Sequence, residues 1–252
     1  MSFNSSVTPK IGQALTCQEC SLADLCLART LSPDDLQQFE LMVRGSPALG
    51  RGETLYRDGD DFKKLYVVKS GSYKTVVSAS DGITQITGFY LPGELFGFDG
   101  FRDKHSCSAV ALEYSRVCEL SLSSIDKLVT KLPTLRWELD RQIAREITSD
   151  QSMLLLLARR TAEERIASFL LSISLRFSQR GFSGIEFRLS MSRHEIANYL
   201  GLAAETVSRI FRRFKEYGIA LSNGRMITIQ NYAVLEDWAN INRKEAYCPS
   251  PY

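Results

Sequence analysis

The sequence predicts an α+β protein with an N-terminal antiparallel β-roll, a long central helix and a C-terminal winged helix-turn-helix. Three observations lead to this prediction. Short stretches rich in Val, Tyr, Phe and Thr alternate with glycines from about residue 48 to 122. A helical pattern follows Pro133, and residues 189–229 combine two short helical segments with a hairpin.

Composition limits the class of protein. Hydrophobic residues make up 44% of the 252 residues, which is enough for a packed core. No apolar run approaches the roughly 20 residues of a membrane-spanning helix. The first residues lack the basic and apolar blocks of a secretory signal. We therefore expect a cytoplasmic protein that does not contact a membrane.

The glycine-rich region is predicted to be a compact antiparallel roll or barrel. Asp81-Gly82 is a typical hairpin turn, and it lies between Val76-Val77 and Ile86-Thr87. Ahead of this region, Ser32 can cap a helix and Pro33 suits its first turn, so a short helix is expected over 32–44.

A single apolar stripe runs along the helix expected over 133–160. Its members follow steps of three and four residues: Leu139, Ile143, Ile147, Asp150, Leu154 and Leu157. A long helix with a narrow apolar seam and polar flanks is typical of a two-stranded coiled coil, so we expect a homodimer. The alternative is an ordinary core helix of the same chain.

The segment 189–229 is predicted to be a winged helix-turn-helix. Ser192 and Glu195 form a capping box that begins the first helix, Gly201 makes the turn, and Gly218 ends the second helix. A small hairpin with Asn223-Gly224 at its turn follows. The second helix buries one face and exposes another, which carries Glu205, Ser208, Arg209, Arg212 and Arg213.

These exposed side chains suit the major groove of DNA. Glu205 can accept a hydrogen bond from cytosine N4, and Arg209 can donate to guanine O6 and N7. Ser208 suits a phosphate or a base, whereas Arg212 and Arg213 lie further back and suit phosphates. The alternative is a solvated basic helix in a winged domain that binds protein.

Three cysteines cluster near the N-terminus as Cys17-x2-Cys20-x5-Cys26. Thiolates are soft ligands that suit an iron–sulfur cluster or zinc, and the spacing alone favours neither. A leader without a ligand is a third interpretation. A 4Fe–4S cluster needs a fourth ligand, for which the candidates are Cys107, Cys118 and Cys248. Cys118 can equally be an ordinary core cysteine.

An enzymatic function is not expected. The sequence has two histidines, His105 and His194, and no recognisable catalytic dyad or cofactor loop. We interpret each histidine as an ordinary surface or capping-turn residue.

Taken together, these motifs resemble the Crp–Fnr superfamily of bacterial transcription regulators, and within it the FNR branch, from about residue 15 to 230. The resemblance rests on the cysteine spacing and on several further stretches. These are Gln85–Gly93 in the roll, Val117-Cys118-Glu119 at its end, Thr161–Arg165, and Glu205–Arg209 in the second helix.

The resemblance implies that Cys17, Cys20, Cys26 and Cys118 hold an oxygen-labile 4Fe–4S cluster. In the family, this cluster favours the DNA-binding dimer, and oxygen converts it to a 2Fe–2S form and dissociates the dimer. The implied target is a palindrome resembling TTGAT, four unspecified base pairs, then ATCAA. Glu205, Ser208 and Arg209 match the positions that contact bases, and RNA polymerase is the implied protein partner.

Three positions depart from related patterns. Cyclic-nucleotide-binding relatives carry a Glu and an Arg-Ser pair in the roll, where this chain has Phe98 and Cys107-Ser108. Phe98 cannot accept from a ribose hydroxyl and Cys107 cannot pair with a phosphate, so no cyclic nucleotide is expected. Ala204 stands where FNR usually has valine. Cys107 is an additional thiol that can compete as a ligand.

Asp150 is the one acid on the apolar stripe of the long helix. In a parallel dimer, its two copies approach each other and repel. We therefore predict that Asp150 weakens the dimer and that an intact cluster repositions the helix, so that Ile147 packs well enough to offset the repulsion. The alternative is that Asp150 faces solvent, or pairs with Arg145 or Arg159 of the partner.

The predicted domains follow from these assignments. Residues 1–30 form the cysteine-rich leader that binds the cluster, and 31–132 form a sensor roll resembling cyclic-nucleotide-binding domains. Residues 133–160 form the dimerisation helix, and 161–252 form the DNA-binding domain.

Overall fold

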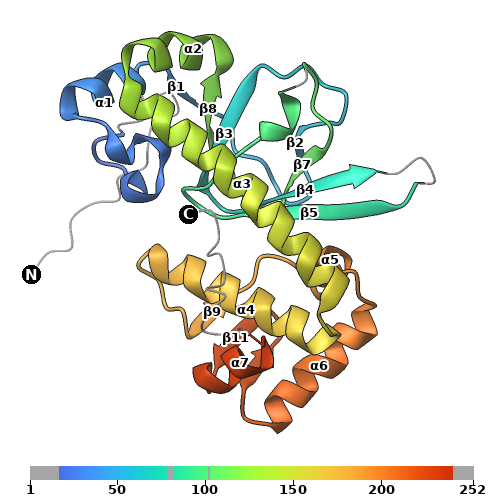
Figure 1. Ribbon diagram of the computed structural model, residues 1–252. Helices are drawn as coiled ribbons and strands as arrows, with labels where there is room; N and C mark the ends of the chain where they lie inside the picture. Colours follow the sequence, from blue (N-terminus) through green and yellow to red (C-terminus); the bar gives the residue numbers. More distant parts are fainter. Residues whose placement is uncertain (1–16, 79–81, 102, 241–252) are drawn as a thin grey trace, which may run out of the picture.

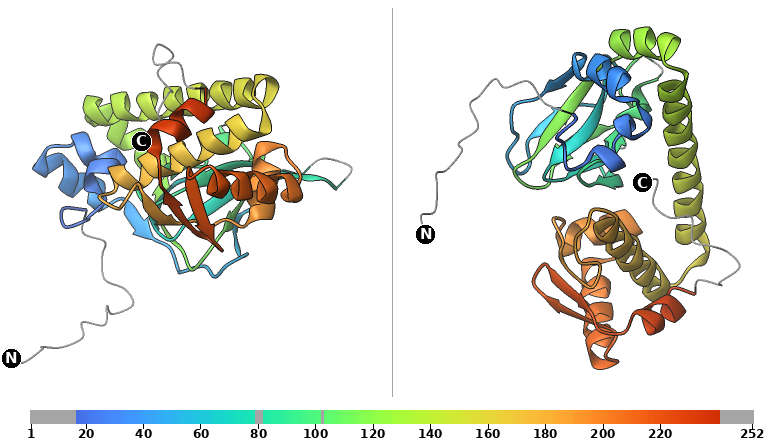
Figure 2. Two further views of the ribbon diagram at one scale, coloured as in Figure 1. Left: turned by 90° about the horizontal axis from the view of Figure 1, so that it is seen from below. Right: turned by 90° about the vertical axis from the view of Figure 1, so that its left-hand side faces the viewer.

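The computed structural model describes residues 17–78, 82–101 and 103–240. It has a β-roll and a helical C-terminal domain, joined by one long helix that runs along the side of both (Figures 1 and 2). This is the α+β architecture that the sequence predicts. Within the described residues, no helix combines the length and the apolar character that a membrane crossing requires.

The roll consists of two four-stranded antiparallel sheets, ordered β1-β8-β3-β6 and β2-β7-β4-β5. Aromatic side chains fill the space between them, with Tyr73 and Phe96 fully buried. The predicted hairpin is β4 and β5, and Asp81 at its turn lies outside the described residues. The strands are β1 (Val43–Gly45), β2 (Thr54–Tyr56), β3 (Lys64–Ser70), β4 (Tyr73–Ser78), β5 (Thr84–Tyr90), β6 (Leu95–Phe96), β7 (Ser108–Ala111) and β8 (Arg116–Ser121).

The described part of the leader forms two short 3-10 helices, η1 (Ala23–Leu25) and η2 (Leu27–Thr30). Helix α1 (Pro33–Glu40) follows, and the Ser32 hydroxyl caps it by accepting from the Asp35 amide at 3.2 Å. The expectation of a helix to residue 44 is wrong. The chain leaves the helix because Val43–Gly45 pairs with β8, and this non-local pairing outweighs the local helical preference.

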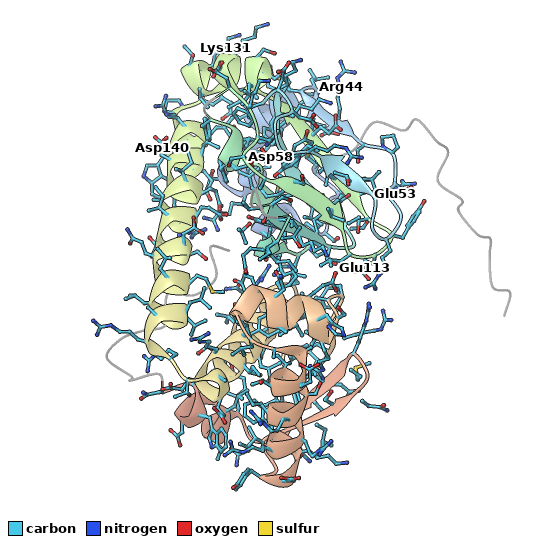
Figure 3. The ribbon with its side chains drawn as sticks, turned by 90° about the vertical axis from the view of Figure 1, so that its right-hand side faces the viewer. Arg44, Glu53, Asp58, Glu113, Lys131 and Asp140 are labelled. Carbon is cyan, nitrogen blue, oxygen red and sulfur yellow. The ribbon has the colours of Figure 1, made fainter. Side chains whose placement is uncertain are left out.

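After α2 (Leu122–Lys131), helix α3 spans Pro133–Arg159, which matches the prediction to within one residue. Its first half packs on the roll and the leader, where Leu135 and Leu139 are buried. In the second half of α3, the rest of the chain does not cover the apolar stripe. Ile147 and Leu154 are 54% and 67% exposed there. Asp140 lies on the outer side of the same helix (Figure 3).

The C-terminal domain is a winged helix-turn-helix built on α4 (Ala162–Gln179). The predicted capping box is present, since the Glu195 amide donates to Ser192 Oγ at 3.2 Å and the Ser192 amide donates to Glu195 Oε2 at 2.6 Å. Gly201 adopts the left-handed conformation between the two helices, with φ at +62°. Around α4 lie β9 (Glu186–Arg188), α5 (Arg193–Leu200), α6 (Ala204–Glu216), β10 (Ala220–Asn223), β11 (Met226–Ile229) and α7 (Tyr232–Trp238).

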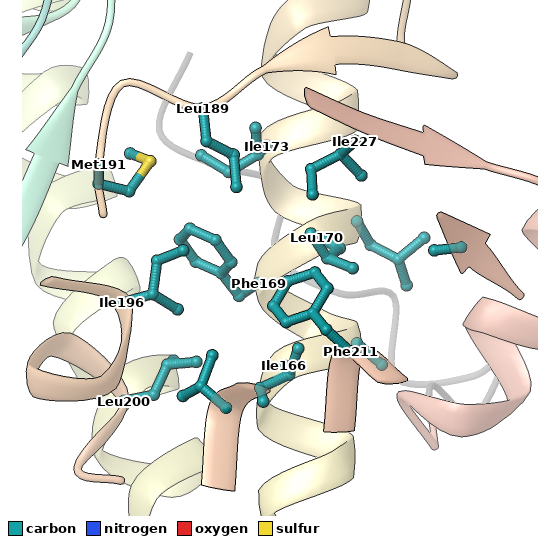
Figure 4. Close-up of a cluster of buried hydrophobic side chains, with 14 of the residues drawn as sticks. Ile166, Phe169, Leu170, Ile173, Leu189, Met191, Ile196, Leu200, Phe211 and Ile227 are labelled. Carbon is teal, nitrogen blue, oxygen red and sulfur yellow. The ribbon is translucent and has the colours of Figure 1, made fainter. Parts of the chain in front are cut away.

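The core of this domain surrounds α4, from which Ile166, Phe169, Leu170 and Ile173 project (Figure 4). The same core continues into the roll, because Ile86, Phe89 and Leu91 belong to it. Ring centroids of Phe89 and Tyr199 lie 4.9 Å apart. Polar contacts add to this junction. Lys74 pairs with Glu195 at 2.9 Å, and Asn198 accepts from the Ile86 amide at 2.6 Å. The roll and the DNA-binding domain are therefore packed together and not only tethered.

A buried ionic cluster lies where the roll, α3 and α4 meet. Glu94, which is 0% exposed, pairs with Arg176 of α4 and with Arg180, which directly follows α4. Nearby, the Tyr90 hydroxyl donates to Glu146 of α3 at 2.9 Å. Burial raises the pKa of the Glu146 carboxyl to about 7, and the charges of Asp150 and Glu94 add to the shift.

This pKa predicts a pH-dependent stability. In the folded protein the pKa of Glu146 lies above its ordinary value of 4.5. The contribution of this group to folding stability is therefore fully present below pH 4.5 and is lost as the pH rises through about 7. A Glu146→Gln variant keeps a carbonyl for Tyr90 but cannot ionise. In urea denaturation, it should be more stable than the parent at about pH 8, and the difference should shrink towards about pH 5. A difference that is the same at both pH values would contradict this assignment.

Candidate functional site

Four cysteine thiols line one pocket between the leader and the roll. Cys17, Cys20 and Cys26 come from the leader, and Cys118 comes from β8. The other walls are mostly apolar and include one cation, Lys69 of β3. They are formed by Leu22, Ala23, Ala28, Phe39, Val43, Val67, Val68, Lys69 and Leu120. The structure thus brings together the four cysteines that the family resemblance implies.

Local backbone bonds explain how the leader presents its thiols. The Cys20 amide donates to the Cys17 carbonyl at 3.3 Å, and the Cys26 amide donates to the carbonyls of Leu22 and Ala23 at 3.0 and 3.2 Å. These turns bring cysteines with different spacings to the same side. Cys118 is held more firmly, because β8 pairs with both β1 and β3 and places it opposite Gly45 and Val67.

The pKa values of Cys17, Cys26 and Cys118 are raised above the ordinary value of a thiol. Burial and, to a smaller extent, the neighbouring Cys26 raise the pKa of Cys17 and of Cys118 to about 12 in each case, although Lys69 opposes the shift. Burial also raises the pKa of Cys26. Cys17, Cys26 and Cys118 therefore favour the protonated form in spite of Lys69, whereas binding of a metal group would release the protons of its ligands. The four soft donors and the apolar walls fit a thiolate-bound metal group.

The four thiols surround the pocket without meeting at one point. Among the residues that the structure describes, no three His, Cys, Asp or Glu side chains lie close enough together to hold one metal ion directly.

The other candidate cysteine, Cys107, lies apart from this pocket. It is buried in the aromatic core between the two sheets, with its sulfur 3.9 Å from the Tyr56 hydroxyl. Cys248 lies outside the described residues. Cys107 therefore has no direct access to the leader in this conformation.

The expectation for His105 is wrong, because this residue is buried and not a surface group. Its ring stacks on Tyr56 with centroids 3.7 Å apart, and its Nδ1 lies 3.2 Å from Asp99 Oδ2. Asp99 also accepts from the amides of Ser106 and Cys107. A single histidine in a sequence does not indicate such non-local partners. His194 is exposed on α5, as expected.

Helix α6 has the two faces that the sequence predicts. Val207, Ile210, Phe211 and Phe214 are buried. Of the polar side chains on the other face, Glu205, Ser208, Arg209 and Arg212 are exposed. Arg213 differs, because it is half-buried and pairs with Glu163 of α4 at 2.5 Å. It therefore supports the helix within its own domain.

Arg193 is a residue that the sequence analysis missed. Its guanidinium lies 3.4 Å from the centre of the Phe211 ring, and its Nη2 donates to Ser222 on the wing. Its Nη1 is buried without a hydrogen-bond partner among the described residues. Burial lowers the pKa of Arg193 to about 10. Arg193 thus joins the first helix, the second helix and the wing, a role that no local sequence pattern indicates.

The β-roll, the long helix and the exposed polar face of the winged helix-turn-helix define a class of DNA-binding transcription regulators. Comparisons with known proteins agree. A Crp-like helix-turn-helix domain matches residues 164–238, and a cyclic nucleotide-binding domain matches residues 48–131.

Relatives match nearly the whole chain. The transcriptional activator protein Anr of Pseudomonas protegens is 48% identical over 214 residues, which cover 84% of this chain and 88% of that protein. The fumarate and nitrate reduction regulatory protein of Escherichia coli strain K12 is 43% identical over 236 residues, which cover 93% of this chain and 94% of that protein. The structure of FixK2 from Bradyrhizobium japonicum is similar with a TM-score of 0.71 at 30% identity, covering 78% of this chain and 96% of that chain.

The chain belongs to the Crp–Fnr family. It is a DNA-binding transcription regulator similar to FNR and Anr, and not an enzyme.

Proposed function

We propose that this regulator responds to oxygen through a 4Fe–4S cluster held by Cys17, Cys20, Cys26 and Cys118. The observation that carries the proposal is the lining of one pocket by these four thiols. The relatives' names, Anr and the fumarate and nitrate reduction regulatory protein, support the same function. When bound, such a cluster supplies a centre that oxygen destroys, and the regulator is then inactivated.

The residues around the pocket have distinct roles in this proposal. Cys118 is the fixed ligand, because it lies on a strand paired on both sides. The three leader cysteines are adjustable, so binding ties the leader to the roll. Lys69 offsets part of the negative charge of four thiolates, since its charge lowers the pKa of Cys17 and Cys118. Apolar walls limit the access of water.

Single serine variants test the ligand assignment. We expect Cys17→Ser, Cys20→Ser, Cys26→Ser and Cys118→Ser to lose most iron and sulfide after oxygen-free purification, because serine is a poor soft ligand. Cys107→Ser is the matched control, since Cys107 is buried in the same roll away from the pocket, and it should keep the parent content. Zinc in place of iron and sulfide, or a full cluster in Cys118→Ser, would refute the assignment.

We further propose that Glu205, Ser208 and Arg209 contact bases in a TTGAT-N4-ATCAA-like palindrome. Their exposure on one face of α6 supports this assignment. Arg212 and Arg213 then contact phosphates, and Arg213 shares its charge with Glu163. RNA polymerase is the protein partner in this proposal, and the protein works in the cytoplasm. Phe98 and Cys107 leave the roll without the groups that bind a cyclic nucleotide, so none is expected.

Arginine variants distinguish base contacts from phosphate contacts. Arg209→Ala should cost about 1–3 kcal/mol on the specific site and relax specificity at one base pair. Arg212→Ala should weaken specific and random DNA alike and reduce the salt dependence of binding. Both effects can be measured by fluorescence anisotropy at several salt concentrations. If Arg209→Ala weakens specific and random DNA equally, Arg209 does not contact a base.

For the dimer, we propose that the exposed part of the α3 stripe forms the seam and that Asp150 weakens it. Ile147 and Leu154 of this stripe are more than half exposed in the single chain and need a covering surface. Burial already raises the pKa of Asp150 within one chain. A second α3 would bury its carboxylate further and oppose it with a like charge.

Asp150→Ala tests this switch in air. The variant should form dimers and bind the TTGAT-type site without a cluster, as measured by sedimentation and by DNA titration. Asp140→Ala is the matched control, because Asp140 lies on the outer side of the same helix and pairs with Arg136 (Figure 3). A cluster-free Asp150→Ala protein that stays as monomeric as the parent would show that Asp150 is not the residue that weakens the dimer.

A further inference from the structure

The turn at Pro92, Gly93 and Glu94, between β5 and β6, contacts the leader on one side. A methyl group built on Gly93 would lie 2.9 Å from the Leu25 Cβ, so Leu25 packs directly against the backbone of the turn. Leu25 immediately precedes Cys26, which lines the cysteine pocket. Gly93 also has φ near +90°, a conformation that favours glycine. The turn is therefore shaped to accept the leader at close range.

The same turn contacts α4 of the DNA-binding domain on its other side. The Glu94 carboxylate accepts from Arg176 Nε at 2.8 Å and also pairs with Arg180. Backbone carbonyls of the turn and of the preceding strand β5 accept further hydrogen bonds. Arg180 Nε donates to the Pro92 carbonyl at 2.7 Å, and Arg176 Nη2 donates to the Phe89 carbonyl at 2.6 Å. Both arginines lie in the last turns of α4, or directly after it.

We propose that this turn is a relay within one chain, through which the packing of the leader sets the position of the DNA-binding domain. The inference rests on the proposed function, because it assumes that the leader changes when the cluster is lost. It adds a connection from the leader to the DNA-binding domain that does not involve the dimer seam. Displacement of Leu25 allows the turn to move, and Glu94 then shifts with the turn. Arg176 and Arg180 must either move with Glu94 or lose their ion pairs with it.

The physical reason is the cost of leaving Glu94 unpaired. The carboxylate is completely buried, and a buried charge that loses its partners is strongly unfavourable. In the proposed relay, Glu94 is therefore either paired with both arginines or released from them. Such an element can convert a small shift of the leader into a reorientation of α4.

Amide hydrogen exchange of residues 176–181 tests the relay. In the parent, we expect removal of the cluster by oxygen to raise exchange there by about 5-fold or more, the lower end of typical coupling. Leu25→Ala should retain the parent's iron and sulfide, yet exchange rapidly in both states. Leu36→Ala is the matched control, because Leu36 is also a partly buried leucine and packs against the apolar cluster that the leader, the roll and α3 share. It should behave as the parent does.

A second variant acts from the other side of the turn. Glu94→Gln keeps the shape of the side chain but removes its charge, so residues 176–181 should exchange rapidly with the cluster present. Glu113→Gln is its control, since Glu113 is a half-buried acid at an edge of the roll that bonds Ser72 (Figure 3).

The outcomes separate the two proposals. A parent purified without oxygen that lacks iron and sulfide refutes the proposed function, and the relay with it. A loaded parent whose exchange does not change on cluster loss refutes the relay alone. A change that persists undiminished in Leu25→Ala comes from dimer dissociation, and it also refutes the relay.

Discussion

A completely buried carboxylate, Glu94, is the constraint on which the arrangement of the two domains depends. Such a charge is tolerated only when it is paired and hydrogen-bonded. Its cationic partners are Arg176 of α4 and Arg180, which directly follows α4. The roll is therefore not complete as a separate unit. The apolar core that continues from α4 to Ile86 and Leu91 strengthens the same junction. Any motion of the DNA-binding domain relative to the roll must break or move these contacts.

The cysteine pocket is subject to a second electrostatic constraint. Buried thiols close to one another hold their protons, as the raised pKa of Cys17 and Cys118 indicates. A metal group reverses this preference, because thiolates are its ligands. The proposed sensor thus has two distinct charge states at the place where the leader meets the roll. Leu25 places that change of state next to Gly93 and Glu94, while Arg29 ties the leader to Glu138 of α3 at 2.9 Å.

The local features of this fold could be predicted from the sequence. The capping box at Ser192, the turn at Gly201 and the period of α3 are set by neighbouring residues, and the structure contains each of them. The winged domain contains two elements that were not predicted. Strand β9 joins the hairpin as a third strand, and helix α7 packs on α4. The end of α1 was placed too late, because β1 depends on a partner strand far along the chain.

The candidate site was predictable only in part. The spacing of the leader cysteines indicated a metal group, but spacing alone left the fourth ligand and the metal open. Family resemblance pointed to Cys118. In the structure, Cys118 lines the pocket of the leader cysteines, whereas Cys107 is buried in the aromatic core between the two sheets. The pairing of Arg213 with Glu163, the stacking of Arg193 on Phe211 and the burial of Glu94 all join distant segments. No local pattern encodes such contacts.

The central claim is that the state of the cysteine pocket controls DNA binding. The most direct measurement follows one sample of oxygen-free protein as air is admitted, recording its visible absorption and its affinity for a TTGAT-N4-ATCAA site together. We expect absorption from thiolate-bound iron to be present at the start and to decay at the same rate as the specific affinity. Undiminished specific affinity after the absorption has disappeared would contradict the account.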